Sequence, residues 1–416
     1  MLILISAGEA SGEMYGAQLI EALREAAEKN PAELRSAGQP GEAVAAQAEK
    51  LSFFGVGGER MRAAGCDTVV DAKELAVVGI TEILNHLPKI LGLYKHLIRE
   101  ADRRKPDLAI VIDSPAFNWR VARQMKRRGI PTIYYVAPQF WAWRQGRVKL
   151  LRDYIDKALV IFPFEEQFYR DRGVDAAFVG HPLANLPRPT ISREEYARKF
   201  NLDPAKQWIT LMPGSRRKEV RMNLWTMSDA VLLLGSDYEY LLPVAPTLDP
   251  EFLYREMGEY EMGNTRTELP DIKLVPDALP ALFHSRAGIV ASGTATVEAA
   301  MMNTPFVMVY RVSPLTYLLG KPRVKVLRFA MVNLIADEAI VPELVQHNFT
   351  ANKVVYFMKQ ILPDGDARNR MLEGLARVRA LLRGSETTTD YVQPADRAAE
   401  IILTFGRLGA SNRTRQ

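Results

Sequence analysis

The sequence has a single cysteine, no long apolar run and no histidine–cysteine spacing typical of a zinc site. Cys66 is that cysteine, so a framework of intramolecular disulfides is excluded and a reducing compartment fits the chain. We find no run of about 18 uncharged apolar residues, so the sequence predicts no transmembrane helix. The opening MLIL lacks a basic n-region and a cleavage site, and we expect a strand there rather than an export signal.

The familiar phosphate-binding and hydrolase motifs are absent as well. The early stretch ISAGEASGEMYG places Gly8, Gly12 and Gly16 four residues apart, which matches neither G-x-G-x-x-G nor a P-loop. It contains Glu9 and Glu13 and no lysine or arginine. Because a negatively charged loop is a poor phosphate cradle, we expect this loop to bind hydroxyl groups. No G-x-S-x-G or H-E-x-x-H motif occurs.

Composition bounds the size of the core and leaves the partner open. The chain has 416 residues, of which 48% are hydrophobic, so a substantial core and two or more domains are expected. The net charge of +5 is mild. By itself this charge does not distinguish nucleic acid, a membrane surface or a phosphorylated ligand as the partner.

Short apolar runs alternate with helical patterns along the chain, which predicts parallel α/β sheets. The runs cover residues 1–6, 108–113, 132–137, 157–162 and 176–180, and then 207–212, 239–244, 272–276, 287–292 and 305–310. A proline-rich stretch near 182–205, without a long apolar run, separates the two series and is interpreted as a linker. We therefore expect two Rossmann-like domains that face each other across a cleft, with ligands at the carboxyl ends of the strands.

These patterns predict three parts of the chain. Residues 1–185 form the first Rossmann-like domain, residues 206–350 form the second, and residues 351–416 form C-terminal helices that return to the N-terminal domain. Residues 31–50 are rich in alanine, glycine and glutamate and are interpreted as a surface insertion.

The motif LAIVIDSPAFNWR places Asp113 at the end of a buried strand. One interpretation is structural: Asp113 or Ser114 caps the next helix, with Pro115 in its first turn. The other is a carboxylate at the ligand-binding edge that accepts a proton from a bound hydroxyl group. The two are compatible, because Ser114 can cap the helix while Asp113 points outward.

The motif LMPGSRRKEV indicates an anion site. A strand ends, Pro213 and Gly214 turn the chain, Ser215 can cap, and a helix starts with Arg216. A helix N-terminus offers free N–H groups and positive potential to an anion. Arginines there are unfavourable unless an anion compensates them, which favours a phosphate ligand over a solvated basic turn.

The motif IVASGTATVEAAM repeats the strand–turn–helix pattern. Ser292, Gly293 and Thr294 form the turn, and Glu298 follows Thr294 by four residues, which does not fit a capping box. A carboxylate here suits the paired hydroxyl groups of a ribose. The alternative is an ordinary exposed glutamate on a helix.

An apolar stretch, LAVVGITEILNHLPKILGLYKHLIREADRRKP at 75–106, carries cations at its edge. It fits either an apolar patch that lies on anionic lipid or a core helix with a basic end. The candidate patch residues are Val77, Val78, Ile80, Ile83, Leu84 and Leu87.

The order of these motifs resembles the lipid-A-disaccharide synthase family. The resemblance covers about residues 1–30 and 51–350 and includes AGEASGEMYGAQLI, FFGVGGERM, IDSPAFNWR, YYVAPQFWAWRQGR, FPFEEQFY, LMPGSRRKEV, ASGTATVEAAM and MVNLIADEAIVPEL. It implies an inverting glycosyltransferase of the GT-B fold that needs no metal or other cofactor. The implied reaction joins UDP-2,3-diacylglucosamine to 2,3-diacylglucosamine 1-phosphate, giving the β-1,6-linked disaccharide 1-phosphate and UDP.

The resemblance also assigns roles to residues. Asp113 is the leading general base, with Glu9 as its rival. Arg216 holds the diphosphate together with Gly214 and Ser215. Glu298 binds the ribose, beside Ser292, Gly293 and Thr294, and Asn333 lies near the donor. The acceptor side comprises Ser11, Gly12, Asn118 and Trp143.

The implied setting is the cytoplasmic face of the inner membrane in Gram-negative bacteria, where the partners are the two lipid substrates and the membrane surface, without nucleic acid. A homodimer is also expected. Two alternatives stay open: another UDP-sugar-dependent GT-B enzyme with a different acceptor, and a non-catalytic nucleotide-binding module.

Overall fold

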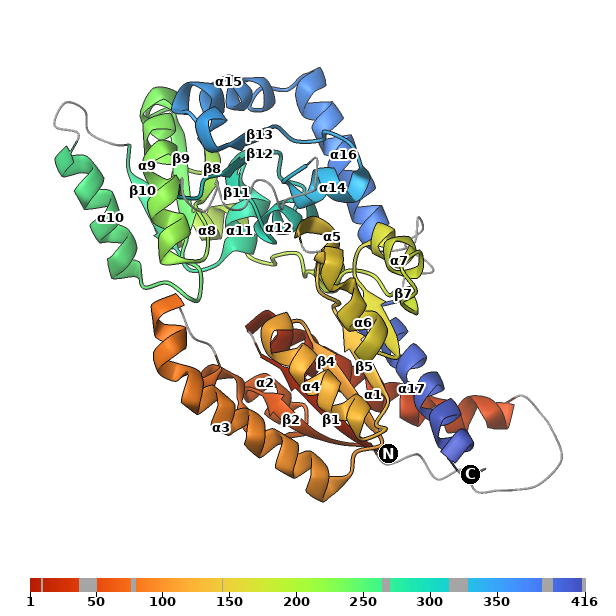
Figure 1. The fold of residues 1–416 in the computed structure, drawn as a ribbon. Helices are drawn as coiled ribbons and strands as arrows, with labels where there is room; N and C mark the ends of the chain where they lie inside the picture. Colours follow the sequence, from red (N-terminus) through yellow and green to blue (C-terminus); the bar gives the residue numbers. More distant parts are fainter. Residues whose placement is uncertain are drawn as a thin grey trace. The chain divides into compact units, whose positions relative to one another are not determined.

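The computed structural model divides the chain into two compact units (Figure 1). The first comprises Met1–Pro182 and Thr387–Gln416, and the second comprises Leu183–Glu386. The structure describes all residues except 9, 37–50, 76–79, 144, 264–269, 314–327, 384–391 and 414–416, and it leaves out the side chains of 10, 30–36, 80–87, 143, 261–263 and 407–413. Within the described part, no helix is long and apolar enough to cross a bilayer.

The first unit is built on a seven-stranded sheet in the order β3-β2-β1-β4-β5-β6-β7. Every pair of neighbouring strands is parallel. The strands are β1 (Leu2–Ala7), β2 (Ser52–Gly57), β3 (Cys66–Asp71), β4 (Leu108–Ile112), β5 (Thr132–Tyr135), β6 (Lys157–Val160) and β7 (Ala176–Phe178). The strand order reverses between β1 and β4, and ligands bind at such a switch point in open α/β sheets.

Helices cover both faces of this sheet. They are α1 (Ala10–Ser36), α2 (Glu59–Ala63), α3 (Ile80–Arg104), α4 (Pro115–Arg127), α5 (Phe140–Trp143), α6 (Val148–Tyr154), α7 (Pro163–Arg170) and α17 (Pro394–Arg413). Helix α17 packs along α1. On the other face, side chains of α3, α4 and α6 form one buried cluster with alternate residues of the strands, such as Leu4 and Val111. The alternation follows from the period of two along a strand.

The second unit has a six-stranded sheet in the order β10-β9-β8-β11-β12-β13. All of its pairs are parallel. The strands are β8 (Gln207–Met212), β9 (Tyr238–Pro243), β10 (Ile272–Val275), β11 (Ala287–Ala291), β12 (Phe306–Tyr310) and β13 (Glu343–Val345). Here the order reverses between β8 and β11, which is the second switch point.

The helices of the second unit are α8 (Arg193–Phe200), α9 (Arg217–Leu234), α10 (Pro250–Gly263), α11 (Ala278–His284), α12 (Ala295–Met301), α14 (Met331–Ala336), α15 (Ala351–Ile361) and α16 (Asp366–Arg383). Helix α15 packs on α9, and α16 packs on α12 and α14. Of the C-terminal helices, α15 and α16 belong to the second unit, and α17 belongs to the first.

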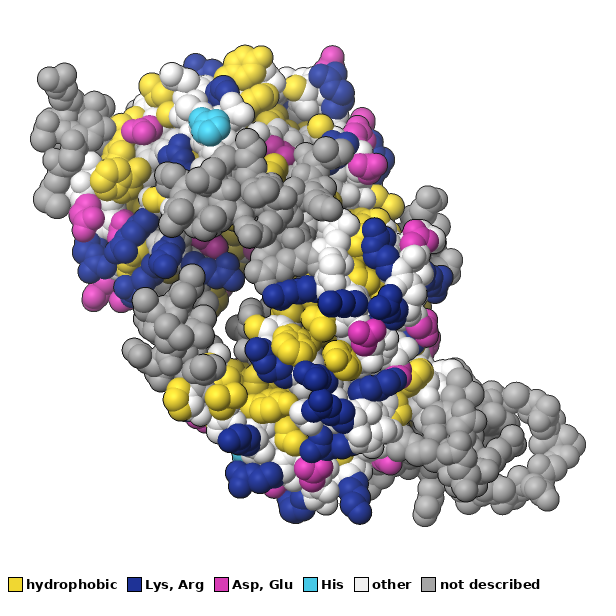
Figure 2. Space-filling view, in the orientation of Figure 1, with side chains coloured by type: hydrophobic (Ala, Val, Ile, Leu, Met, Phe, Trp, Pro, Cys, Tyr) yellow, Lys and Arg dark blue, Asp and Glu magenta, His cyan; other side chains and the backbone are white. Residues whose placement is uncertain are grey.

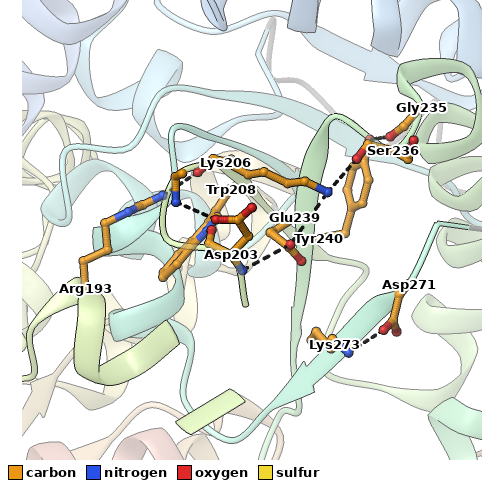
Figure 3. A network of polar contacts seen from close by, with 11 residues as sticks. Arg193, Asp203, Lys206, Trp208, Gly235, Ser236, Glu239, Tyr240, Asp271 and Lys273 are labelled. Atoms are coloured by element: carbon orange, nitrogen blue, oxygen red, sulfur yellow. Dashed lines mark hydrogen bonds and ion pairs between the residues drawn. The ribbon is translucent and has the colours of Figure 1, made fainter. Parts of the chain in front are cut away.

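A polar network ties the start of the second sheet together (Figure 3). The Trp208 indole donates a hydrogen bond to the Asp203 carbonyl at 2.8 Å, and the Arg193 guanidinium lies 3.8 Å over the indole ring. Lys206 donates to the Ser236 carbonyl at 2.9 Å. These contacts lie at the amino ends of β8 and β9, the edge opposite the switch-point turns, so we interpret them as structural.

The prediction of two parallel-sheet α/β domains is confirmed, while several local predictions need correction. Strands β3 and β13 were not predicted, because neither is a continuous apolar run. The stretch interpreted as a linker contains helix α8, whose Ser192 hydroxyl accepts the Glu195 N–H at 3.1 Å. Helix α1 runs to Ser36, so the first residues of the expected insertion at 31–50 are helical.

Candidate functional site

The turn after β4 holds Asp113 in an unusual backbone conformation. Asp113 and Ser114 have φ angles of +47° and +44°, a left-handed conformation that is uncommon for residues other than glycine. Ser114 occupies the N-cap position of α4, but its side chain makes no capping hydrogen bond. Two donors hold the Asp113 carbonyl oxygen, namely the Tyr134 hydroxyl at 2.7 Å and Asn118 Nδ2 at 2.9 Å.

Asn118 is fully buried beneath this turn. Its Nδ2 also donates to the carbonyl oxygens of Ile112 at 2.8 Å and Ser6 at 3.2 Å, and its Oδ1 accepts the Ser6 hydroxyl at 2.7 Å. Strained backbone of this kind persists only where surrounding contacts fix it. The Asn118 amide thus shapes the Asp113 turn, and its role as an acceptor contact stays a prediction.

The loop after β1 packs against the same turn. A Cβ on Gly8 would lie 2.6 Å from Ser114 Oγ, so the close approach of the two turns requires glycine there. The Ser11 hydroxyl lies 3.5 Å from Asp113 Oδ2, and Gly12 is buried beside Ile112 and Asp113. The structure therefore brings Ser11, Gly12 and Asn118 together with Asp113 at the switch point between β1 and β4.

The early stretch after β1 carries two carboxylates, Glu9 and Glu13. Glu13 Oε1 accepts the backbone N–H of Arg60 at 2.8 Å, at the start of α2, and this contact is structural. Glu9 lies outside the described residues, so its role as the rival base stays a prediction.

The segment after β5 is anchored by a buried carboxylate. Glu165 accepts the Trp141 indole N–H at 2.7 Å and the backbone N–H groups of Ile161 and Phe162 at 3.0 Å each. Burial raises the pKa of Glu165 to about 7. These contacts fix the chain just before Trp143, whose side chain is outside the described part.

In the second unit, the turn after β8 carries the predicted anion-binding residues. Gly214 has φ +126°, which suits glycine. Helix α9 begins at Arg217, with Arg216 at the N-cap, so the expectation that Ser215 caps this helix is wrong. The Arg216 side chain is 73% exposed.

Glu219, in the first turn of α9, contacts the backbone and side chain of the turn after β8. Its Oε2 accepts the Ser215 N–H at 3.2 Å, and its Oε1 pairs with Arg216 Nη1 at 2.9 Å. A carboxylate is favourable near a helix N-terminus. Burial and the Glu219 charge together raise the pKa of Tyr310, at the end of β12. Glu219 was not predicted as a site residue, although it follows Ser215 by four residues and therefore lies one helical turn away.

The turn after β11 lies beside the turn after β8. The register pairs Val290 with Met212, so both turns start at neighbouring strand ends. The Ser292 hydroxyl donates to the Phe329 carbonyl at 2.9 Å, and Gly293 has φ +141°. Thr294 is exposed, and burial raises the pKa of Glu298 on α12. The residues predicted for the sugar nucleotide therefore converge on one switch point, except for Asn333.

Asn333 is buried in α14 and is fully engaged. Its Nδ2 donates to the Val341 carbonyl and to Glu343 Oε1, at 2.8 and 2.9 Å, while its Oδ1 accepts the N–H groups of Ile340 and Val341. Glu343 also accepts the Phe329 N–H. Through these bonds Asn333 shapes the segment that Ser292 contacts.

The side chains of the candidate membrane patch lie outside the described part of the structure. Val77 and Val78 lie outside the described residues, as do the side chains of Ile80, Ile83, Leu84 and Leu87 on α3. The described part of α3 packs inward at Leu97 and Ala101. Nowhere in the described part are three or more His, Cys, Asp or Glu side chains grouped so that they could hold a metal ion.

Two doubly wound units in one chain, each with polar turns at its switch point, place the chain in the class of proteins with a GT-B-like fold. A UDP-GlcNAc 2-epimerase from Neisseria meningitidis, solved with UDP-GlcNAc, is similar with a TM-score of 0.57 at 10% identity over 97% of this chain and 99% of that one. A calicheamicin glycosyltransferase gives a TM-score of 0.55 at 15% identity, covering 97% and 98%. At these identities the likeness shows the fold.

The sequence comparison is more specific. The family model for lipid-A-disaccharide synthetase matches residues 3–390. Lipid-A-disaccharide synthases of Koribacter versatilis and Acidobacterium capsulatum are 50% and 48% identical to this chain, over 97% and 91% of it and 98% and 91% of their own lengths. The chain belongs to the lipid-A-disaccharide synthase family and is a glycosyltransferase. The family implies a UDP-sugar donor and a lipid acceptor.

Proposed function

We propose that this chain transfers diacylglucosamine from UDP to diacylglucosamine 1-phosphate, forming a β-1,6-linked disaccharide 1-phosphate and UDP. The observation that carries the proposal is the Asp113 turn at the switch point of the first sheet, where Asn118 and Tyr134 donate hydrogen bonds to the main-chain carbonyl oxygen of Asp113 and so fix the residue that bears the carboxylate. Asp113 takes the proton from the acceptor 6-hydroxyl while that oxygen attacks C1 of the donor. The bond from C1 to the UDP oxygen breaks, and UDP leaves with the electron pair.

Arg216 is the proposed partner of the donor diphosphate, with the Gly214–Ser215 backbone beside it. Its guanidinium is exposed and can form a bidentate pair with phosphate oxygens, through two parallel N–H···O hydrogen bonds. Positive charge placed where negative charge develops stabilises the departing UDP. Glu298 is the proposed ribose contact beside Ser292, Gly293 and Thr294.

The test of this function is UDP release that depends on the lipid acceptor. The purified protein is given the UDP-diacylglucosamine donor alone, with diacylglucosamine 1-phosphate, or with the deacylated acceptor, and the products are identified by mass spectrometry. Release with the acylated acceptor and formation of the disaccharide phosphate support the proposal. Transfer to an unacylated acceptor favours another GT-B enzyme, and UDP binding without any transfer favours a nucleotide-binding module.

Asn118→Ala should lower both stability and turnover. The change removes the hydrogen bonds between Asn118 and the Ser6 hydroxyl and the Ile112 and Asp113 carbonyl oxygens, which costs about 1–3 kcal/mol of unfolding free energy. It also releases the Asp113 turn, so kcat should fall while the Kd for UDP stays unchanged. Urea unfolding, steady-state kinetics and calorimetry measure the three quantities.

A matched control separates positioning from stability. Thr304 is buried in the second unit and donates to the Leu282 carbonyl, so Thr304→Val should destabilise the fold without lowering kcat of the folded enzyme. If both variants lose kcat in proportion to their stability, Asn118 has no special role in positioning Asp113.

Glu219→Gln should tighten UDP binding. The Glu219 carboxylate holds the Ser215 N–H and Arg216, the same groups that the diphosphate is proposed to use. Removing one charge a few ångströms from an exposed anion changes its binding free energy by about 1 kcal/mol, which is about fivefold in Kd. Calorimetric titration with UDP checks the change, and weaker binding would show that Glu219 instead orients Arg216 for the ligand.

We further propose that the protein associates with a membrane surface, since both proposed substrates carry acyl chains. Replacing Val77, Ile80 and Leu84 with serine should release the protein from phosphatidylglycerol vesicles in a sedimentation assay. Leu233→Ser, at a 53% exposed leucine of the second unit, is the matched control and should leave binding intact. Unfolding or aggregation of the triple variant would place these residues in the core.

A further inference from the structure

Asn223, in the second turn of α9, fixes the turn after β8. Its Nδ2 donates to the Pro213 carbonyl oxygen at 2.8 Å, and its side chain is almost fully buried. Asn118 makes the same kind of contact in the first unit, where it donates to the Asp113 carbonyl oxygen from the helix that follows β4. At both switch points, therefore, a buried asparagine of the next helix holds a main-chain carbonyl of the turn.

The side chain of Asn223 carries a cost for stability. Its Oδ1 is buried and has no hydrogen-bond partner among the described residues. Burying a polar atom without a partner is unfavourable, and a leucine of similar branched shape would avoid that penalty. Such exceptions to good packing concentrate at functional sites. An asparagine at this position is thus better explained by its contact with the turn than by packing.

The contact with Pro213 sets the direction of the next N–H group. The peptide bond between Pro213 and Gly214 is trans. The Gly214 N–H therefore points opposite to the Pro213 carbonyl and away from Asn223. By holding the carbonyl, the buried amide orients a hydrogen-bond donor of the turn.

Thr247, in the loop after β9, acts on the same turn. Its hydroxyl donates to the Ser215 carbonyl oxygen at 2.5 Å, so the Arg216 N–H points away from Thr247 for the same reason. Glu219 accepts the Ser215 N–H, while no described residue accepts the N–H of Gly214 or of Arg216. Two oriented donors of the turn are thus left for a ligand.

The start of α9 adds positive charge to these donors. Figure 2 shows lysine and arginine side chains gathered where α9 and α10 begin. Arg216, Arg217 and Lys218 are exposed there. Backbone N–H groups that are oriented in advance, with cations beside them, suit an anion that has several oxygens.

We propose that Asn223 is a positioning residue for the donor diphosphate, because it holds the Pro213–Gly214 peptide so that the Gly214 N–H meets a phosphate oxygen. The inference rests on the proposed function, which places the diphosphate at this turn. Asn223 does not touch the ligand and acts through the backbone. Orienting the donor before the ligand arrives spares the cost of ordering it on binding.

Asn223→Leu tests the proposal by calorimetric titration with UDP and with uridine, which lacks the phosphates. The Kd for UDP should rise about tenfold, because a hydrogen bond to a charged group loses its orientation. The Kd for uridine should stay unchanged. The melting temperature should stay the same or rise, since the change also removes the unpartnered Oδ1. An equal rise in Kd for both ligands, or no rise for UDP, overturns the proposal.

Two further variants keep the result interpretable. Asn223→Ala, which adds no bulk, should show the same difference between UDP and uridine even if Asn223→Leu folds poorly. Ser228→Ala is the matched control, because Ser228 is buried on the same helix and its Oγ also has no partner among the described residues. It should leave both Kd values unchanged. A loss of UDP binding as large as that of Asn223→Leu would contradict a special role for Asn223.

Wild-type binding separates this inference from the proposed function. If the wild-type protein binds UDP no more tightly than uridine, the diphosphate does not meet the turn, and the proposed donor site fails together with the inference. If it binds UDP more tightly and Asn223→Leu keeps the whole difference, the role of Asn223 fails by itself. If the expected differences appear without any sugar transfer, Asn223 keeps its role and the proposed function fails.

Discussion

Asp113→Asn should fold, bind UDP with unchanged Kd and lose about 10²- to 10⁴-fold in kcat, the range that general acid–base catalysis contributes. An amide of the same shape cannot accept the proton of the acceptor hydroxyl. The change keeps the size of the side chain beside Ser11 Oγ, which lies 3.5 Å from Asp113 Oδ2. Steady-state kinetics with both lipid substrates measure the loss, and calorimetry with UDP checks the donor site.

The backbone is the reason to expect an intact fold in this variant. Residue 113 has φ +47°, and asparagine is among the few residues that adopt this region readily. The hydrogen bonds from Tyr134 and Asn118 reach the carbonyl oxygen of residue 113 and do not depend on its side chain. Ser11→Ala, which removes a weak contact, should have a small effect. Near-normal turnover of Asp113→Asn would exclude this carboxylate as the base and make Glu9→Gln the next variant to measure.

The position of Asp113 could be predicted because buried parallel strands appear in a sequence as short apolar runs. The strand at 108–112 is fully buried, so Asp113, the first polar residue after it, must lie at its carboxyl end. The same reasoning located Gly214 after β8 and Ser292 after β11. Polar edge strands cannot be predicted in this way. Strand β3 is an example, because three positions between Cys66 and Val70 are exposed or half-exposed.

Long-range partners could not be predicted in this way. Asn118 contacts Ser6, which lies 112 positions away in the sequence. The sequence does not indicate whether the Asn118 amide binds a ligand or the backbone. Tyr134 resembles any aromatic residue of a buried strand until its hydroxyl is seen on Asp113. Asn333 poses the same difficulty, because its four hydrogen bonds to Ile340, Val341 and Glu343 depend on a turn that has no distinctive pattern.

Arg216→Ala should lower kcat/KM by about 10²- to 10³-fold, the usual cost of removing one group that stabilises developing charge. The guanidinium is exposed and is held by Glu219 alone among the ion pairs of the described residues, so its removal should barely change stability. Arg216→Lys keeps the charge but not the planar pair of N–H donors, and we expect it to recover only part of the loss. Arg370→Ala, at an exposed arginine of α16, is the matched control and should be neutral.

Combining this change with Glu219→Gln shows whether the two side chains act on the same ligand. In Arg216→Ala the Glu219 carboxylate stays at the turn, without its cation, and repels the diphosphate; the double variant lacks that repulsion. It should therefore bind UDP more tightly than Arg216→Ala does, and the two changes should deviate from additivity, as residues that share a ligand do. Strict additivity would mean that Glu219 and Arg216 do not act on a common diphosphate. A kcat/KM for Arg216→Ala within about threefold of wild type, below the range for such a group, would remove the turn after β8 from the donor site altogether.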